Sequence, residues 1–160
     1  MWFDMKNIKT TEAGDFSAIM HNPVGRHLGY MLRRASSVIM AGLGSSLASI
    51  DLRPVEATIL SLIATNPGCT QSDLGRMLSI QRANMVPLIT GLVTRGYICK
   101  TAADGRSHAL NLTEQGIAKC QEAESMMDQH ETSIAQQLDR AGHDVARLEE
   151  ALTAIMKLSA

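Results

Sequence analysis

Aromatic residues are scarce in this sequence: they make up 3% of its 160 residues, whereas methionine occurs ten times. A core of aliphatic side chains and methionine favours packed helices over a β-sandwich. The length suits one compact domain, or one domain with helical additions. Such a chain is long enough to bury about two-thirds of the surface that its unfolded form exposes.

Cysteine is also rare, and Cys69, Cys99 and Cys120 have no paired spacing. This pattern argues against a disulfide scaffold and favours inert, reduced thiols over a redox sensor. No apolar run approaches the roughly 18 residues that a membrane span needs. The first residues, MWFDMKNIKTTEAGDF, lack the apolar segment of a secretory signal. We therefore expect a cytoplasmic protein that makes no membrane contact.

Motifs of common catalytic sites are missing as well. The sequence has no Gly-rich phosphate loop, no G-x-S-x-G and no H-E-x-x-H. The adjacent acids Glu149 and Glu150 are typical of a solvated helix face. No zinc-binding spacing connects the histidines, which are His21, His27, His108, His130 and His143. We expect a protein that is not an enzyme and that binds neither a metal nor a cofactor.

Charge is unevenly distributed, although the net charge is -1. Residues 70–112 carry five basic and two acidic side chains, whereas 113–160 carry four basic and nine acidic ones. The near-neutral total excludes a uniformly cationic, histone-like DNA binder but allows a local basic patch. The surplus in 70–112 is modest, so on charge alone a chance distribution remains an alternative.

Hydrophobic periodicity predicts a series of helices. Apolar residues within 27–49 recur at helical spacing and form one stripe, which Gly42 and Gly44 weaken. Further helices are expected over the segments 55–68, 70–78, 81–96, 114–138 and 145–155. Pro54 suits the first turn of the second helix, and Thr70 with Asp73 resembles a capping box at the start of the third.

The order of elements in the middle of the chain predicts a winged helix-turn-helix. A short helix, a tight turn at Ser79-Ile80 and a second helix are followed by strands at 97–101 and 108–112. Asp104-Gly105 between the strands is a strong hairpin turn signal. The fold class that follows is mainly α with a small β-hairpin wing, flanked by helices at both ends. In this motif the helix after the turn enters the DNA major groove.

The DNA-contacting residues are predicted from their places in this motif. Side chains that begin the second helix reach base edges, although Gln81 could instead be an N-cap. Those at the start of the first helix suit a phosphate, and those at the wing tip suit the DNA backbone or minor groove. The predicted contacts are Thr70, Gln71, Ser72, Gln81, Arg82, Asn84, Arg106, Ser107 and His108.

Two further arginines remain open between two roles. Arg76 and Arg95 lie near the predicted interface, where each is either a phosphate contact or one partner of a structural ion pair. The candidate acids for such pairs are Asp73 and Asp104. We interpret Asp104 itself as a turn and ion-pair residue rather than a contact.

Two segments resemble motifs of the MarR (multiple antibiotic resistance regulator) family: TQSDLGRMLSIQRANMVPLITGLVTRGYI and ADGRSHALNLTEQG. The resemblance extends over about residues 27–158. It implies a homodimeric repressor or activator that binds a pseudo-palindromic operator and is released by a small molecule. Two features depart from the family pattern. Pro87 should kink or shorten the recognition helix, and Gly91 and Thr94 stand where acids are usual.

The resemblance also implies that the first and the last two helices form the dimer interface. A stripe at the C-terminal end supports this expectation, with Val145, Leu148, Leu152 and Ile155 at the spacing of a helix–helix seam. We therefore divide the chain into an N-terminal arm (1–22), a helical dimerisation region (23–50 and 113–160) and a winged helix-turn-helix DNA-binding domain (51–112).

A ligand pocket is predicted from arginines and methionines near the apolar stripe of the first helix. A buried arginine there would require an anion, such as a carboxylate, a phosphate or the tail of a thioester cofactor. The alternative is an exposed or dimer-bridging pair. The candidate residues are Tyr30, Met31, Arg33, Arg34 and Met126. The resemblance implies aromatic acids, phenolics or acyl-CoA esters as ligands.

Two classes of function remain after these steps. The first is a homodimeric, sequence-specific transcriptional regulator, a repressor that an aromatic acid or acyl-CoA ligand relieves. Its partners are duplex DNA, a second copy of the chain and the effector. The second is a winged-helix protein-interaction module that acts as an anti-regulator. A shared basic face at Arg82 and Arg106 with few acids nearby would favour the first class.

Overall fold

The computed structural model describes residues 22–102 and 108–158, and the chain divides into two compact units, Met1–Val38 and Ile39–Ala160. In the first unit, a turn leads into α2 (Leu28–Leu47), which continues into the second unit. The side chain of Asn22 closes this turn. Its oxygen accepts the backbone N–H of Val24 at 3.2 Å, and its amide donates to the Tyr30 hydroxyl at 3.0 Å.

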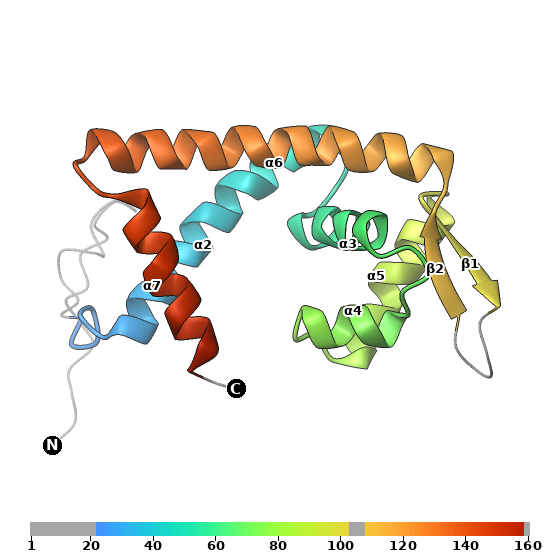
Figure 1. The fold of residues 1–160 in the computed structure, drawn as a ribbon, viewed down its shortest axis with the longest axis horizontal. Helices are drawn as coiled ribbons and strands as arrows, with labels where there is room; N and C mark the ends of the chain where they lie inside the picture. Colours follow the sequence, from blue (N-terminus) through green and yellow to red (C-terminus); the bar gives the residue numbers. More distant parts are fainter. Residues whose placement is uncertain (1–21, 103–107, 159–160) are drawn as a thin grey trace, which may run out of the picture. The chain divides into compact units, whose positions relative to one another are not determined.

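Among the residues described in the second unit, the regular structure is helical apart from one antiparallel hairpin (Figure 1). After α2 its elements are η1 (Ala48–Ile50), α3 (Pro54–Thr65), α4 (Gln71–Met77), α5 (Arg82–Thr94), β1 (Ile98–Ala102), β2 (His108–Leu112), α6 (Glu114–Arg140) and α7 (Val145–Lys157). The predicted fold class is confirmed: α3, α4, α5 and the hairpin form a winged helix-turn-helix. The division by function into arm, dimerisation region and DNA-binding domain remains a prediction.

Local sequence signals fix the helix ends. Thr70 and Asp73 form the expected capping box, in which each side chain accepts the backbone N–H of the other residue. The tight turn before α5 places Ser79 at a positive φ of 52°. The helix predicted over 27–49 ends at Leu47 and continues as one 3-10 turn. Pro87 lies inside α5, but it does not end the helix, which continues to Thr94.

The hairpin is tied to the start of α4. Its register pairs Ile98 with Leu112 and Ala102 with His108. On the outer side of β2, the N–H of Gly68 donates to the carbonyl of Leu110, whose own N–H donates to Cys69, both at 2.9 Å. The segment before α4 is therefore joined to β2 by an isolated bridge, between Thr70 and Ala109. Gly68 has a φ of 83°, a conformation that glycine adopts without strain.

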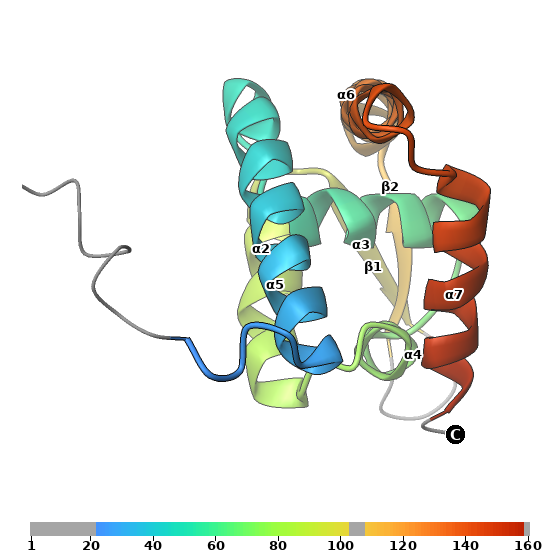
Figure 2. The same ribbon diagram turned by 90° about the vertical axis from the view of Figure 1, so that its left-hand side faces the viewer.

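The core lies where α3, α5 and the inner face of the hairpin meet α6, which crosses above α3 (Figure 1). Viewed along α6, α3 and the two strands lie beneath the helix (Figure 2). The large, fully buried side chains of the core are aliphatic or methionine, as the composition predicts. The largest are Leu47, Ile59, Leu60, Ile63, Met85, Ile89, Leu92 and Leu110.

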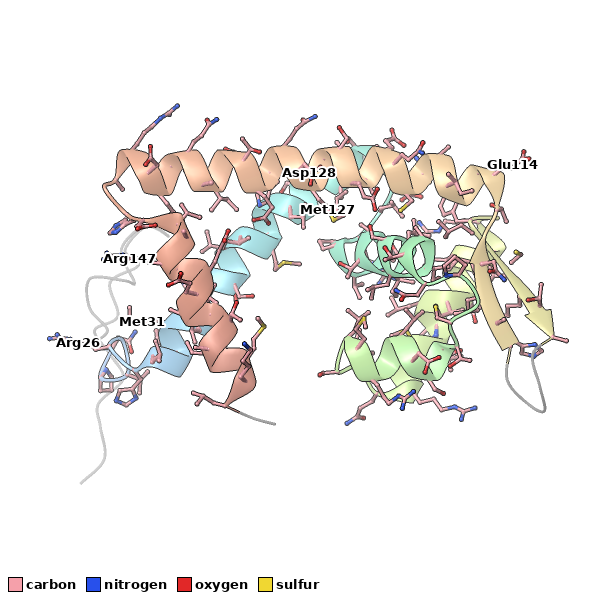
Figure 3. The ribbon with its side chains drawn as sticks, viewed as in Figure 1. Arg26, Met31, Glu114, Met127, Asp128 and Arg147 are labelled. Carbon is pink, nitrogen blue, oxygen red and sulfur yellow. The ribbon has the colours of Figure 1, made fainter. Side chains whose placement is uncertain are left out.

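Long α6 has a core side and a solvent side. It begins at Glu114, directly after β2, and Met127 packs against the core whereas Asp128 is exposed (Figure 3). Further along, the His130 ring lies against Gly42 of α2, with its Nε2 at 3.0 Å from the carbonyl oxygen of Ile39. These contacts join α6 to the second half of α2.

None of the helices that the structure describes is by itself long and apolar enough to cross a membrane. The helical segments Leu28–Ile50 and Pro54–Thr65 have the length and the apolar composition of a membrane span only when the two are taken together.

Candidate nucleic-acid interface

A surface hollow of about 590 Å³ lies between α4, α5 and the hairpin. Its lining residues come from the start of α4, the first residue of α5 and both strands: Thr70, Gln71, Ser72, Arg82, Lys100, His108 and Leu110. The pairing of Gly68 with Leu110 brings these elements together. Five of the predicted DNA contacts therefore line one surface.

Lys100 is the residue of this surface that the sequence-based prediction missed. It follows Ile98 by two positions and so lies on the same face of β1, opposite Leu110. Ile98 and Leu110 are buried, whereas Lys100 is exposed. The signal that could have identified it is a basic residue within a predicted strand that pairs with the strand beginning at His108.

Asp73, an acid in the first turn of α4, is already paired. The Asp73 carboxylate accepts hydrogen bonds from the Thr70 hydroxyl at 2.7 Å and the Thr70 backbone N–H at 2.9 Å, and it forms an ion pair with Arg76. These bonds, led by that of the hydroxyl, lower the pKa of Asp73 to about 2. Of the two roles that the sequence left open for Arg76, the structure shows the ion pair, with Asp73 as its partner. The Thr70 hydroxyl is engaged in the cap of α4.

The first turn of α5 is open to solvent. Gln81 occupies the N-cap position, but its side chain makes no capping hydrogen bond. Gln81, Arg82 and Asn84 are all exposed, while Met85 in the same turn is fully buried. Burial of one side of the helix therefore fixes which polar side chains face outward. On the wing, His108 is exposed, and the predicted contacts Arg106 and Ser107 lie outside the described residues.

Arg95 is the second structural ion-pair residue, and it pairs with Glu56, an acid that the sequence-based prediction did not name. Its guanidinium donates to the Glu56 carboxylate at 2.7 Å and to the backbone carbonyl of Asp51 at 2.7 Å. Arg53 donates to the same carboxylate at 2.9 Å. Although burial opposes ionisation of Glu56, the bonds from Arg53 and the charge of Arg95 lower its pKa overall.

The predicted effector residues belong to different units. Tyr30, Met31, Arg33 and Arg34 lie on the first half of α2, where the Arg33 guanidinium is 5.6 Å from the centre of the Tyr30 ring. Met126 lies on α6 in the second unit and packs against its core. Their grouping into one pocket remains a prediction.

The predicted dimerisation stripe lies on α7, which contributes no buried residue to the chain's core. Leu148 and Leu152 are 43% and 36% exposed, and Met156 is 71% exposed. Within residues 22–102 and 108–158, no three histidine, cysteine or acidic side chains are arranged to hold a metal ion.

Comparison with known proteins places these features in context. A model of the MarR family matches residues 50–107. A curated protein of Thauera aromatica, described as a candidate transcriptional regulatory protein for the hcr operon, is 26% identical over 121 residues. That alignment covers 72% of this chain and 73% of the relative.

Solved structures of the transcriptional repressor CouR are similar over most of the chain. One is 30% identical with a TM-score of 0.72, covering 81% of this chain and 92% of CouR. CouR bound to p-coumaroyl-CoA has a TM-score of 0.78 and 27% identity, covering 86% of this chain and 97% of that one. CouR bound to a 23-mer DNA duplex has a TM-score of 0.75 and 27% identity, covering 88% and 100%.

Proposed function

The chain belongs to the MarR family of transcriptional regulators, and on this premise we propose that it is a homodimeric repressor that binds a pseudo-palindromic operator and releases it when an aromatic acid or its acyl-CoA ester binds. The observation that carries the proposal is the surface between α4, α5 and the hairpin. Five of the side chains that the motif predicts for DNA line it together with a further basic side chain, Lys100.

Charge supports a nucleic-acid partner for this surface. Arg82 and Lys100 both line the hollow, and its described lining residues include no acid. The neighbouring Asp73 has its charge offset by Arg76. A DNA phosphate would therefore meet a positive potential with little local repulsion. Attraction between basic side chains and phosphates is the main source of DNA affinity. Because Thr70 is committed to the cap, Gln71 and Ser72 are the better phosphate contacts at the start of α4.

Sequence preference would come from α5. Gln81 and Asn84 are exposed at its start, and amide side chains suit the edges of adenine bases in the major groove. The wing, including Arg106, Ser107 and His108, would follow the adjacent backbone or minor groove. Two such domains on one dimer would enter successive major grooves about 34–36 Å apart.

The effector class rests on the likeness to CouR in its complex with p-coumaroyl-CoA. Arg33, Arg34, Tyr30, Met31 and Met126 are the residues proposed to bind the effector. Arginine suits a carboxylate or the phosphates of a CoA tail. Methionine adapts to an aromatic acyl group. A ligand that favours a non-binding spacing of the two DNA-binding domains by about 100-fold, or about 2.7 kcal/mol, would release the operator.

The alternative, a protein-interaction module that acts as an anti-regulator, predicts a surface suited to protein rather than phosphate. The basic character of the hollow favours the regulator. The two proposals are separated by a fluorescence-anisotropy titration of the full chain against duplexes flanking its own gene, at two salt concentrations. A random duplex serves as the non-specific reference.

Selective binding that weakens with salt supports the regulator, and its release by p-coumaroyl-CoA but not by free CoA supports the effector class. Selective DNA binding that neither p-coumaroyl-CoA nor p-coumarate releases would refute an aromatic acid or its acyl-CoA ester as the effector. Equal affinity for operator and random DNA would contradict the regulator and favour the anti-regulator.

Two substitutions assign roles within the surface. Lys100→Ala should weaken binding to all duplexes alike and reduce the salt slope by about one for each protomer of the dimer, as expected for a phosphate contact. Asn84→Ala should instead narrow the difference between operator and random DNA. Lys157→Ala, which removes a base from the end of α7, is the matched charge control. Equal effects of Lys100→Ala and Lys157→Ala would contradict the phosphate role.

A further inference from the structure

A cluster of charged groups connects the end of α5 to the start of α3. Glu56 lies in the first turn of α3, and its side chain is 5% exposed. Its oxygens accept the guanidinium groups of Arg53 and Arg95 and the backbone N–H of Arg53. A buried carboxylate is stable only when its charge is offset and its lone pairs are bonded, and this one meets both conditions.

Arg95 does more than neutralise this carboxylate. It is the C-cap residue of α5, and a second arm of its guanidinium donates to the carbonyl oxygen of Asp51 at 2.7 Å. The same group lies 5.4 Å from the centre of the Tyr97 ring, and its Nε donates to Gly91. One side chain therefore connects α5 to α3 and to residues 51–53, the joint between η1 and α3.

Asp51 occupies a special position in this joint. It is the C-cap of η1, with a φ of 55°, and its carboxylate is almost fully exposed. The helices α2 and η1 precede it in the chain, and the helices that follow it, α3 to α5, belong to the winged helix-turn-helix. A hollow of about 390 Å³ borders the joint and is lined by Asp51 and Arg95. Because Arg95 donates a hydrogen bond to the backbone carbonyl of Asp51, a shift of the preceding helix would change this bond directly.

Only arginine suits all of these contacts. A guanidinium is planar and presents several N–H donors in a fixed fork, so it can hold two acceptors and stack on a ring at once. Lysine would keep the charge beside Glu56 but would lose the fixed bridge to Asp51. Arg53 provides the natural contrast, because it binds Glu56 from α3 itself and its side chain is 66% exposed.

We propose that Arg95 is a positioning residue, which couples the recognition helix α5 to the joint at Asp51 and thereby sets how α5 is presented to DNA. This inference rests on the proposed function, and it assigns Arg95 no contact with phosphate or base. Movement of the helix before Asp51 would pass to α5 through the guanidinium. Arg95 is thus a route by which the effector controls operator affinity.

The test compares Arg95→Lys with Arg53→Ala in the full chain, by anisotropy on operator and random duplexes and by thermal unfolding. Arg95→Lys should lose operator affinity by about tenfold, the size expected for one lost charge-assisted hydrogen bond. Its salt slope and its binding to random DNA should stay as in the wild type. Arg53→Ala should lower the unfolding temperature but leave operator affinity within about twofold, because this variant keeps the bridge to Asp51.

Three outcomes would overturn the inference. The first is a loss of affinity for random DNA in Arg95→Lys as large as the loss for the operator, because a phosphate contact would act on all sequences alike. The second is wild-type operator affinity in Arg95→Lys. The third is an equal loss of operator affinity in both variants, which would reduce Arg95 to a general stability role.

A measurement on the free protein separates this inference from the proposed function. If the wild type shows no selective DNA binding, the proposed function fails, but the coupling is still testable by amide hydrogen exchange. Arg95→Lys should accelerate exchange around Asp51 and at the C-terminal end of α5, whereas Arg53→Ala should not. Unchanged exchange at both places in Arg95→Lys would overturn the coupling.

Discussion

Gly116, in the first turn of α6, lies directly against the carbonyl group of Tyr97, where a Cβ atom would overlap with the oxygen. The backbone N–H of Thr113 donates to the same carbonyl at 3.1 Å, and the Thr113 hydroxyl donates to Gly96 at 2.6 Å. The start of α6 is therefore held against the chain between α5 and β1. Through this contact the long helix is fixed to the wing's base.

The close approach predicts a large cost for a single methyl group. Gly116→Ala should destabilise the fold by roughly 3 kcal/mol, because the obstacle is backbone rather than a flexible side chain. Gly91→Ala is the matched control. Nothing lies within 4 Å of its added Cβ, so the change should stabilise α5 by about 0.5–1 kcal/mol. Urea unfolding of both variants measures the difference, and a Gly116→Ala variant as stable as the wild type would contradict the geometry.

The cap of α4 predicts a dependence of stability on pH. Because the pKa of Asp73 is lowered to about 2, chiefly by the Thr70 hydroxyl, the folded state holds this carboxylate ionised more readily than the unfolded chain does. Asp73 therefore stabilises the fold above its unfolded pKa near 3.8, and this contribution is lost as the pH falls to about 2.

Asp73→Asn isolates this effect, since the other acids titrate equally in both proteins. The stability advantage of the wild type over the variant, measured by urea unfolding, should shrink between about pH 5 and pH 2. Thr70→Val should diminish the same advantage, because it removes the hydroxyl. An advantage that stays constant over this range would show that Asp73 does not titrate with a lowered pKa.

The three cysteines should differ in reactivity. Cys99 is exposed on β1, whereas Cys120 is buried and Cys69 is half-buried. Burial raises the pKa of both the Cys69 and the Cys120 thiols, which keeps them protonated and slow to react. A thiol reagent should therefore modify one cysteine at least about tenfold faster than the others. Cys99→Ser should abolish this fast phase, and a fast phase that persists in the variant would contradict the assignment.

The stripe on α7 predicts a dimer contact. Leu148→Glu and Leu152→Glu should each convert the dimer to a monomer, because a carboxylate would have to be buried in an apolar seam. Ala146→Glu adds the same charge to another face of the helix and should leave the dimer intact. Sedimentation measures the mass, and circular dichroism checks that the helices persist. A dimer that survives both leucine substitutions would place the interface elsewhere.

The local parts of the fold could be predicted from the sequence because their signals are local. The Thr70–Asp73 cap, the start of α3 at Pro54 and the turn at Ser79 each depend on neighbours within a few residues. The apolar spacing then assigned the buried side of each helix, and the hairpin followed from strand pattern and turn.

The contacts that the sequence did not predict join residues far apart in the chain. Arg95 reaches Glu56 across 39 positions, and no periodic pattern links the two. The sequence therefore offered only Asp73 and Asp104 as candidate acids, of which Asp73 pairs with Arg76 and Asp104 lies outside the described residues. Lys100 was missed because its role depends on the strand pairing that opens a hollow beside α4. Packing between elements, rather than local propensity, decides these positions.

The most direct test of the regulator is selection of the full-length protein on a pool of duplexes with a randomised centre, read by sequencing. The proposed dimer predicts an enriched inverted repeat whose half-site centres lie about 10–10.5 base pairs apart, or a multiple of that spacing. The enrichment should collapse in Asn84→Ala and persist in Lys157→Ala. A pool that stays unenriched, or that yields a motif without two-fold symmetry, would contradict a dimeric, sequence-specific DNA-binding protein.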